Sequence, residues 1–204
     1  MKLSARSAGI VVLAAIEVLL VFSQSGTACA SVRLGNVEKL LPARTAICWY
    51  DADILDDLAL NARGKITFLY VDGKLSGALA RLKEEQMKNG PVFEIPPQLF
   101  AYSNKYNSRK KHVVFVARVE AMKIWEFDSG KISVGGYIPS EKDIIRGVSA
   151  NPNAELRHGT VTLPKNYHGY IGFFVPVENV KPGTEVKLEY GEYFTDWLVP
   201  SKNQ

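Results

Sequence analysis

Short runs of apolar or alternating residues recur along this chain, and Gly, Pro, Asn or Asp interrupts them at close intervals. The clearest run is 185–190, in which Val186, Leu188 and Tyr190 alternate with charged residues. Such alternation is typical of a strand with one buried and one solvated face. The run 169–175 is apolar throughout, which indicates a strand buried on both faces. We therefore expect a mainly β protein, an antiparallel β-sandwich with one or two short helices.

Further strands are expected over residues 45–50, 65–71, 92–95, 99–102, 112–120, 122–127, 132–137, 158–163 and 193–199. We expect strand 169–175 to pair with strand 185–190, because Pro182-Gly183 marks a turn between them. Strand 112–120 is expected to pair with strand 122–127 in the same way. No repeat or linker divides the chain after residue 30, so residues 31–204 are predicted to form a single domain.

Helical periodicity is rarer than strand periodicity in this sequence. Over residues 75–87, apolar side chains recur at helical spacing up to a stop at Gly90-Pro91. A second, shorter helix is expected over residues 51–62, and a single turn near residues 140–146. Gly135-Gly136 is expected to form a bulge or bend within a strand.

The first thirty residues have the three parts of a secretory signal peptide: basic residues, an apolar run over 8–22, and the cleavage site Ala28-Cys29-Ala30. A retained membrane anchor is the rival interpretation. It is disfavoured because the run is shorter than the roughly 20 residues that span a bilayer and Glu17 lies within it. We therefore expect an exported protein, periplasmic or extracellular, that begins at Ser31 and has no stable membrane span after cleavage.

Acylation of Cys29, as in a lipoprotein, is the minor alternative for this leader. It is disfavoured because Gly26 stands where such signals usually carry a large aliphatic residue. After cleavage, Cys48 would be the one remaining cysteine, and no intramolecular disulfide could form. Cys48 lies in an apolar stretch, which predicts a small buried hydrophobic residue rather than a nucleophilic thiol.

Basic residues gather in the segment 105–112, which we call the cationic loop. The formal net charge is +4 and the pI is near 9.0. This excess permits attraction to anionic envelope polymers, but it lacks the dense basic pattern of a nucleic-acid binder. Within the loop, Arg109, Lys110 and Lys111 are candidate ligand-binding residues for an anionic glycan, phosphate polymer or lipid headgroup. The plainer interpretation is that the loop is only solvated.

A second candidate segment is Asn166-Tyr167-His168-Gly169-Tyr170. Polar and aromatic loops of this kind can stack on sugars or hold a general base, so Tyr167, His168 and Tyr170 are candidate ligand-binding residues. Packing with one hydrogen bond is the plainer interpretation. The histidines of the chain show no spacing typical of a metal-binding motif.

Acidic residues suggest two further sites, and neither has the expected pattern. Asp51, Asp53, Asp56 and Asp57 are dense enough for calcium, but the Gly and Glu of an EF-hand are missing from the required offsets. We expect these carboxylates to lie in the first turn of helix 51–62. Glu126 and Asp128 share a strand face, yet two carboxylates on one strand do not flank a glycosidic bond. No catalytic constellation, metal site or cofactor site is predicted.

Residues 169–190 include Phe173-Phe174-Val175-Pro176 and the run from Gly183 to Leu188. This stretch resembles the closing strands of immunoglobulin-like domains exported by bacteria. The resemblance implies an immunoglobulin-like form of the sandwich, and it carries over no functional residue.

The sequence combines an export signal with enough apolar residues for a β core, and it lacks a catalytic constellation. This combination favours an exported bacterial protein that acts by binding. We expect a non-enzymatic role in envelope assembly or in ligand binding at the cell surface. The expected partner is an anionic envelope polymer or another envelope protein, and not nucleic acid. The alternative is a secreted enzyme or binding module acting on cell-wall or extracellular polysaccharide, with Glu126, Asp128 and His168 as candidates.

Overall fold

The computed structural model describes residues 36–55, 58–79, 81, 111–149 and 151–201. Within these ranges the protein is mainly β, with antiparallel sheets and two short helices. The mainly β class predicted from the sequence is confirmed. The predicted leader, residues 1–30, and the predicted strands 92–95 and 99–102 lie outside the described residues.

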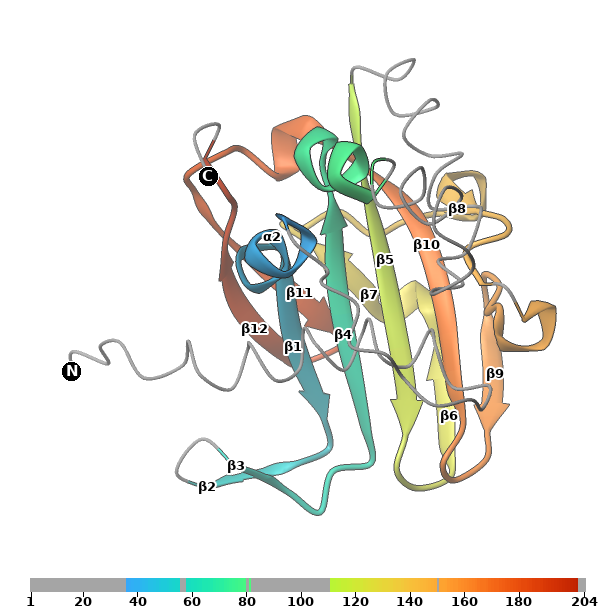
Figure 1. Ribbon diagram of the computed structural model, residues 1–204. Helices are drawn as coiled ribbons and strands as arrows, with labels where there is room; N and C mark the ends of the chain where they lie inside the picture. Colours follow the sequence, from blue (N-terminus) through green and yellow to red (C-terminus); the bar gives the residue numbers. More distant parts are fainter. Residues whose placement is uncertain (1–35, 56–57, 80, 82–110, 150, 202–204) are drawn as a thin grey trace, which may run out of the picture.

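The larger sheet has five strands in the order β1-β4-β5-β10-β8, and neighbouring strands are antiparallel (Figure 1). Its strands are β1 (Thr45–Tyr50), β4 (Gly64–Val71), β5 (His112–Ala121), β8 (Ile144–Ile145) and β10 (His168–Pro176). The three central strands are buried over nearly their whole length, because both faces of the sheet are covered there. The expected strands 45–50, 65–71, 112–120 and 169–175 are confirmed.

A smaller sheet, in the order β12-β11-β7, faces the larger one. Its strands are β7 (Ile132–Val134), β11 (Glu185–Tyr190) and β12 (Tyr193–Leu198). The alternation over residues 185–190 buries Leu188 and Tyr190 and leaves Glu185 and Lys187 in solvent, as predicted. Two further antiparallel pairs are β2 (Asp53–Leu55) with β3 (Leu58–Leu60), and β6 (Trp125–Asp128) with β9 (Thr160–Leu163). Short 3-10 helices are η2 (Ser129–Lys131), η3 (Glu141–Asp143), η4 (Pro152–Ala154) and η5 (Val177–Asn179).

The main core fills the space between the two sheets. Alternate residues of β4, β5 and β10 point into it and meet the inner side chains of β7, β11 and β12. Phe115 stacks on Phe173 within the larger sheet, with ring centroids 6.0 Å apart. Trp197 of β12 packs edge-on against Phe115 and donates a hydrogen bond from Nε1 to the Ala43 carbonyl at 3.1 Å. The last strand is thereby fixed to the first helix of the described chain.

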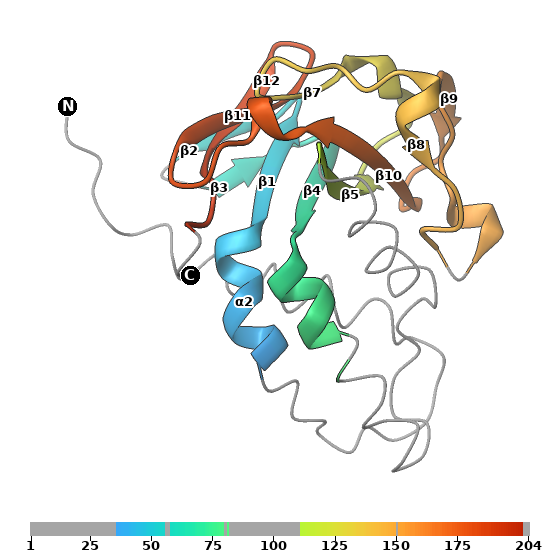
Figure 2. The same cartoon turned by 90° about the horizontal axis from the view of Figure 1, so that it is seen from above.

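A helical layer covers the opposite face of the larger sheet (Figure 2). It consists of α2 (Asn36–Arg44) and a helix over residues 73–79, which together bury a second apolar cluster against β4, β5 and β10. The helix over 73–79 confirms the start of the predicted helix 75–87, and most of its remainder lies outside the described residues. The sequence analysis did not predict α2, which contains Pro42.

The predicted helix over residues 51–62 is wrong, because this segment forms the β2–β3 hairpin. Asp51 and Asn61 flank the hairpin with φ angles of 48° and 56°. Such left-handed backbone cannot continue an α-helix, and Asp and Asn adopt it more readily than most residues. The carboxylates of Asp51 and Asp53 therefore lie at the base of a hairpin and not in a helical turn.

Both predicted strand pairings are also wrong. Strand β10 pairs with β5 and β8, whereas β11 pairs with β12 and β7, so β10 and β11 lie in different sheets. The connection through η5 crosses from one sheet to the other. Strand β6 leaves β5 and pairs with β9, which buries Trp125 and Phe127 in the core between the sheets.

The predicted turn near residues 140–146 is confirmed as η3. The Asp143 carboxylate accepts hydrogen bonds from the Ser140 backbone N–H, the Ser140 hydroxyl and the Tyr137 hydroxyl. Gly135 and Gly136, with φ angles of 55° and 78°, form a tight turn after β7, closed by hydrogen bonds between Val134 and Tyr137. The expected strand 132–137 therefore ends at Val134 and turns back on itself.

Candidate functional site

An open pocket of about 500 Å³ lies where the end of β1 meets β6, β9 and the start of β12. Its lining comes from five separate parts of the chain: residues 50–51, Arg63, residues 125–131, Thr160 and Tyr193. The complete lining is Tyr50, Asp51, Arg63, Trp125, Glu126, Asp128, Lys131, Thr160 and Tyr193. We call this the aromatic pocket.

Packed rings form the inner wall of the aromatic pocket. Tyr50 stacks on Trp125, with ring centroids 4.8 Å apart and planes 15° apart. Tyr190 and Tyr193 each meet Tyr50 edge-on, with centroid distances of 5.1 Å. Trp125 is fully buried, whereas Tyr50 and Tyr193 are half-buried and reach the pocket. These rings support one another, and Tyr50 and Tyr193 bring aromatic edges to a lining that is otherwise mainly polar.

Tyr190 connects the ring cluster to the polar rim. Its hydroxyl oxygen accepts a hydrogen bond from the Asp128 backbone N–H at 2.9 Å. Burial raises the pKa of Tyr190 to about 12, so the phenol stays neutral throughout the physiological range. The Asp128 carboxylate in turn accepts a hydrogen bond from the Gly130 N–H at 2.9 Å, which fixes the start of η2.

Charged groups of both signs form the rim of the aromatic pocket. Arg63 Nε lies 2.8 Å from Asp51 Oδ2, and Arg63 Nη1 also donates to the Ile124 carbonyl at 3.1 Å. Arg63 therefore holds the end of β1 against the turn between β5 and β6. Glu126 and Lys131 are exposed at the same rim, and each makes no ion pair within the described part of the chain.

The pocket includes both carboxylates that the sequence analysis considered for glycoside hydrolysis. Glu126 and Asp128 both lie on β6, opposite Thr162 and Thr160 of β9. They belong to one wall of the pocket, as expected for residues at i and i+2 of one strand. His168 does not line this pocket, so the structure does not bring His168 together with these two carboxylates.

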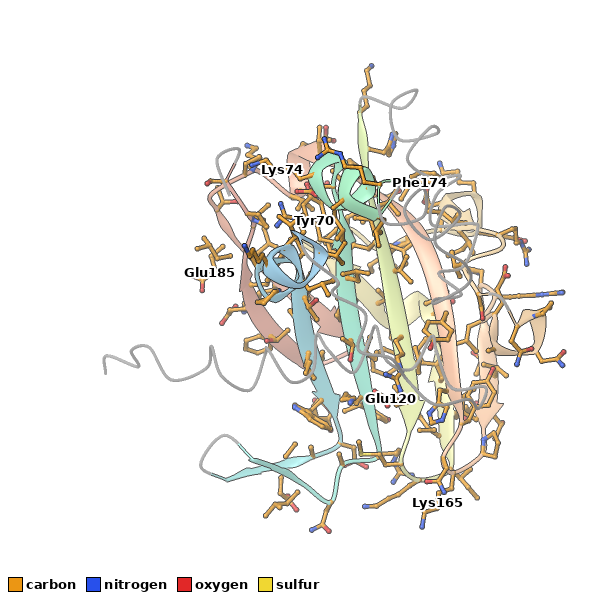
Figure 3. All side chains as sticks on the ribbon, viewed as in Figure 1. Tyr70, Lys74, Glu120, Lys165, Phe174 and Glu185 are labelled. Atoms are coloured by element: carbon orange, nitrogen blue, oxygen red, sulfur yellow. The ribbon has the colours of Figure 1, made fainter. Side chains whose placement is uncertain are left out.

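A second charged cluster lies on the helix-covered face of the larger sheet. Lys65, Glu120 and His168 lie side by side across β4, β5 and β10. Glu120 forms an ion pair with Lys65 Nζ at 2.7 Å and accepts a hydrogen bond from Arg118 Nη2 at 2.9 Å, and all three side chains are largely buried. Glu120 is labelled near the lower end of β5 in Figure 3. Its carboxylate is thus neutralised by two cations and is not a free acid or base.

The other predicted ligand-binding residues occupy separate places. Tyr167 donates a hydrogen bond from its hydroxyl to the Asn153 carbonyl at 3.0 Å, and Tyr170 is buried in the second apolar cluster, where burial raises its pKa. His168 is exposed at the start of β10. His168 and Tyr170 therefore share one face of β10, beside Glu120 and Arg118, whereas Tyr167 packs against the main core.

The cationic loop lies mostly outside the described residues, including Arg109 and Lys110. Lys111 is exposed immediately before β5, and His112 contacts the ring of Phe174. His168 pairs with Glu120, nine positions beyond Lys111, so Lys111 and His168 lie about 30 Å apart. The two candidate segments thus mark opposite ends of the sheet.

The remaining sequence candidates have structural roles. Cys48 is buried in the main core, as predicted, and burial raises the pKa of its thiol to about 11. Asp51 pairs with Arg63 and Asp53 accepts from Asn61 Nδ2 at 3.2 Å, while Asp56 and Asp57 lie outside the described residues. Among the residues that the structure describes, no three His, Cys, Asp or Glu side chains gather closely enough to hold a metal ion.

None of the known protein-family models matches this chain, and neither does any curated protein or solved structure. Within the described ranges, no helix combines the length and apolar character needed to cross a bilayer. The chemistry of the aromatic pocket is therefore the guide to its ligand.

Proposed function

We propose that this chain is an exported, non-enzymatic binding protein of the cell envelope and that its ligand occupies the aromatic pocket. The observation that carries the proposal is the pocket itself. It combines a supported aromatic wall with a rim of charged and hydroxyl groups. Small-ligand sites are usually concave, and a few polar groups placed beside aromatic side chains fix the ligand's orientation in them.

Binding is favoured over catalysis by the state of the polar groups around the pocket. The Asp51 carboxylate is paired with Arg63, and the Asp128 carboxylate accepts from the Gly130 N–H. A general acid or base would need a second group on the opposite side of the substrate. Glu126 and Asp128 are on one strand, and His168 is elsewhere.

Two finer features of the proposal come from the sequence. Residues 1–30 are proposed to be a signal peptide, which supports a periplasmic or extracellular location. The immunoglobulin-like form of the sandwich, suggested by residues 169–190, also stays a prediction. The two facing sheets are compatible with a sandwich, with a helical layer added on one side.

The cationic loop offers a competing binding surface for an anionic envelope polymer. Lys111 is exposed, and it lies at the end of β5 remote from His168. Electrostatic binding through this loop would weaken strongly at high salt, whereas contacts in the aromatic pocket would be far less sensitive. Salt dependence therefore distinguishes the two surfaces.

The test is co-sedimentation of the purified protein with wall polymer and, separately, with membrane, each at low and high salt. We compare the unchanged chain with Tyr193→Ala and with the triple change Arg109→Ser, Lys110→Ser and Lys111→Ser. Salt-resistant binding that Tyr193→Ala abolishes supports the aromatic pocket. Salt-sensitive binding that only the triple change abolishes overturns the pocket assignment and favours the loop. No sedimentation with either fraction overturns the envelope role.

A secreted enzyme acting on polysaccharide is the second candidate, because Glu126 and Asp128 lie in the same pocket as Tyr193. Release of reducing ends from wall or extracellular polysaccharide, lost in Glu126→Gln and Asp128→Asn, would replace the binding proposal. If the unchanged chain and both variants release reducing ends only at the background rate, the result supports binding without hydrolysis.

A further inference from the structure

The rim of the aromatic pocket carries charges of both signs in nearly equal number. Asp51 and Arg63 neutralise each other at 2.8 Å. Glu126 and Asp128 add two carboxylates and Lys131 adds one ammonium group, so one negative charge is left unbalanced, and the Asp128 carboxylate also accepts a hydrogen bond from the Gly130 N–H. A pocket for a strongly charged ligand would present groups of the opposite sign, as electrostatic complementarity requires. This rim instead offers several hydrogen-bond acceptors next to donors.

The inner wall adds a small aromatic surface to this mainly polar rim. The half-buried ring of Tyr193 reaches the pocket and is held edge-on by Tyr50, which in turn is held by Trp125. A sugar ring has C–H groups that pack on aromatic surfaces and hydroxyl groups that both donate and accept. Carboxylates accept from such hydroxyls, and ammonium groups donate to them.

We propose that the aromatic pocket binds a neutral saccharide, with Tyr193 as the stacking surface and with Glu126 and Lys131 as hydrogen-bonding partners of its hydroxyls. This inference rests on the proposed function, because it names the ligand class of the same pocket. The open shape of the site suits a segment of a longer glycan chain as well as a chain end.

Phe194 provides a matched aromatic control for Tyr193. It follows Tyr193 on β12, it is 52 % exposed, and it lies on the outer face of the smaller sheet, where Lys187 Nζ is 4.2 Å from its ring centroid. It does not line the pocket. Glu185 is the corresponding control for Glu126, since it is an exposed strand carboxylate away from the aromatic pocket.

The test is calorimetric titration of the full chain with neutral tetrasaccharides, one series with N-acetyl groups and one without. We expect saturable binding that is unchanged when the salt concentration rises several-fold. Tyr193→Ala should weaken the affinity by about tenfold or more, and Glu126→Gln should weaken it several-fold. Phe194→Ala and Glu185→Gln should leave it unchanged.

Failure of the saccharide inference is distinguishable from failure of the proposed function. No binding of any neutral tetrasaccharide, together with Tyr193-dependent sedimentation on envelope fractions, overturns the inference and keeps the proposed function. Tetrasaccharide binding that Phe194→Ala weakens as much as Tyr193→Ala overturns the pocket as its site. Tyr193→Ala could disturb the fold, because Tyr193 packs on Tyr50, so the exposed residue Glu126 provides a second variant. If the Glu126→Gln chain is folded and binds the tetrasaccharide with unchanged affinity, the inference is also overturned.

Discussion

Arg44, at the end of α2, and Asp72, directly before the helix over residues 73–79, form a buried ion pair with 2.7 Å between Nη2 and Oδ2. Arg44 also donates from Nη1 to the Leu40 carbonyl, and Asp72 accepts from the Leu75 N–H at 2.8 Å. The pair therefore joins the ends of the two helices that cover the larger sheet.

Removal of Asp72 is expected to destabilise the protein strongly, because the Arg44 side chain is only 1 % exposed and would lose its counter-charge. Breaking one side of a buried pair costs about 3 kcal/mol or more. Asp51→Asn is the matched control, because Asn also tolerates the left-handed backbone at this position and the Asp51–Arg63 pair, 40–48 % exposed, should contribute at most about 1 kcal/mol. Urea unfolding of both variants measures the difference. Equal losses would show that burial does not govern these pairs.

Gly64→Ala should distort the aromatic pocket through Trp125. A Cβ at Gly64 would lie 2.3 Å from Cε3 and Cζ3 of the Trp125 ring, so the ring must move. We expect a loss of about 1–3 kcal/mol in unfolding free energy and altered tryptophan fluorescence.

Gly77→Ala is the control for this substitution. A Cβ at Gly77 meets nothing within 4 Å, and the residue is helical. Here the change should stabilise the protein by about 0.5–1 kcal/mol, since alanine has the higher helix propensity. Similar losses in both variants would contradict a steric cause at Gly64.

Alkaline pH should destabilise the protein through Tyr190. Burial raises its pKa from 10.0 to about 12 in the folded state. Between these two values the unfolded chain releases its proton and the folded chain keeps it, so stability is present below pH 10 and falls as the pH rises toward 12. The free energy of unfolding should fall by about 2 kcal/mol more in the unchanged chain than in Tyr190→Phe. Parallel pH curves for the two chains would contradict this assignment.

Cys48 should be unreactive until the protein unfolds. Its thiol is buried in the core and its pKa is raised to about 11, so almost no accessible thiolate exists near neutral pH. In a chain carrying Cys29→Ser, we expect Ellman's reagent to label Cys48 in urea but not in native buffer. Rapid labelling of the native protein would show that the core opens easily at β1.

The strands could be predicted from the sequence, whereas their partners could not. Alternation over residues 185–190 and the apolar run over 169–175 are local patterns that burial imposes on each strand. Pairing is decided by non-local packing, which is why β10 and β11 were wrongly paired. For the segment 51–62, the acidic residues at its start and Gly64 after its end favour a helix, yet the segment forms a hairpin. The left-handed backbone at Asp51 and Asn61 is incompatible with an α-helix and flanks the hairpin at both ends.

The candidate site was predictable only in part for the same reason. Glu126 and Asp128 stand close together in the sequence and could be noticed as a pair. Tyr50, Arg63 and Tyr193 come from distant parts of the chain and meet only because β1 and β12 lie against each other. No local pattern marks them as one surface, although the aromatic richness of residues 49–50 and 190–197 was visible in the sequence.

The hydrogen bond from Trp197 to the Ala43 carbonyl has a consequence for the order of events during synthesis. Its two ends are separated by 154 positions, so α2 must wait for β12, which is made much later. Until residues 193–198 leave the ribosome, β1 lacks its neighbour β12, and the tyrosines of the pocket cannot assemble. Long-range closure of this kind slows folding and prolongs the exposure of unpaired strand edges. Folding of this domain is therefore expected to be completed only after β12 has been made.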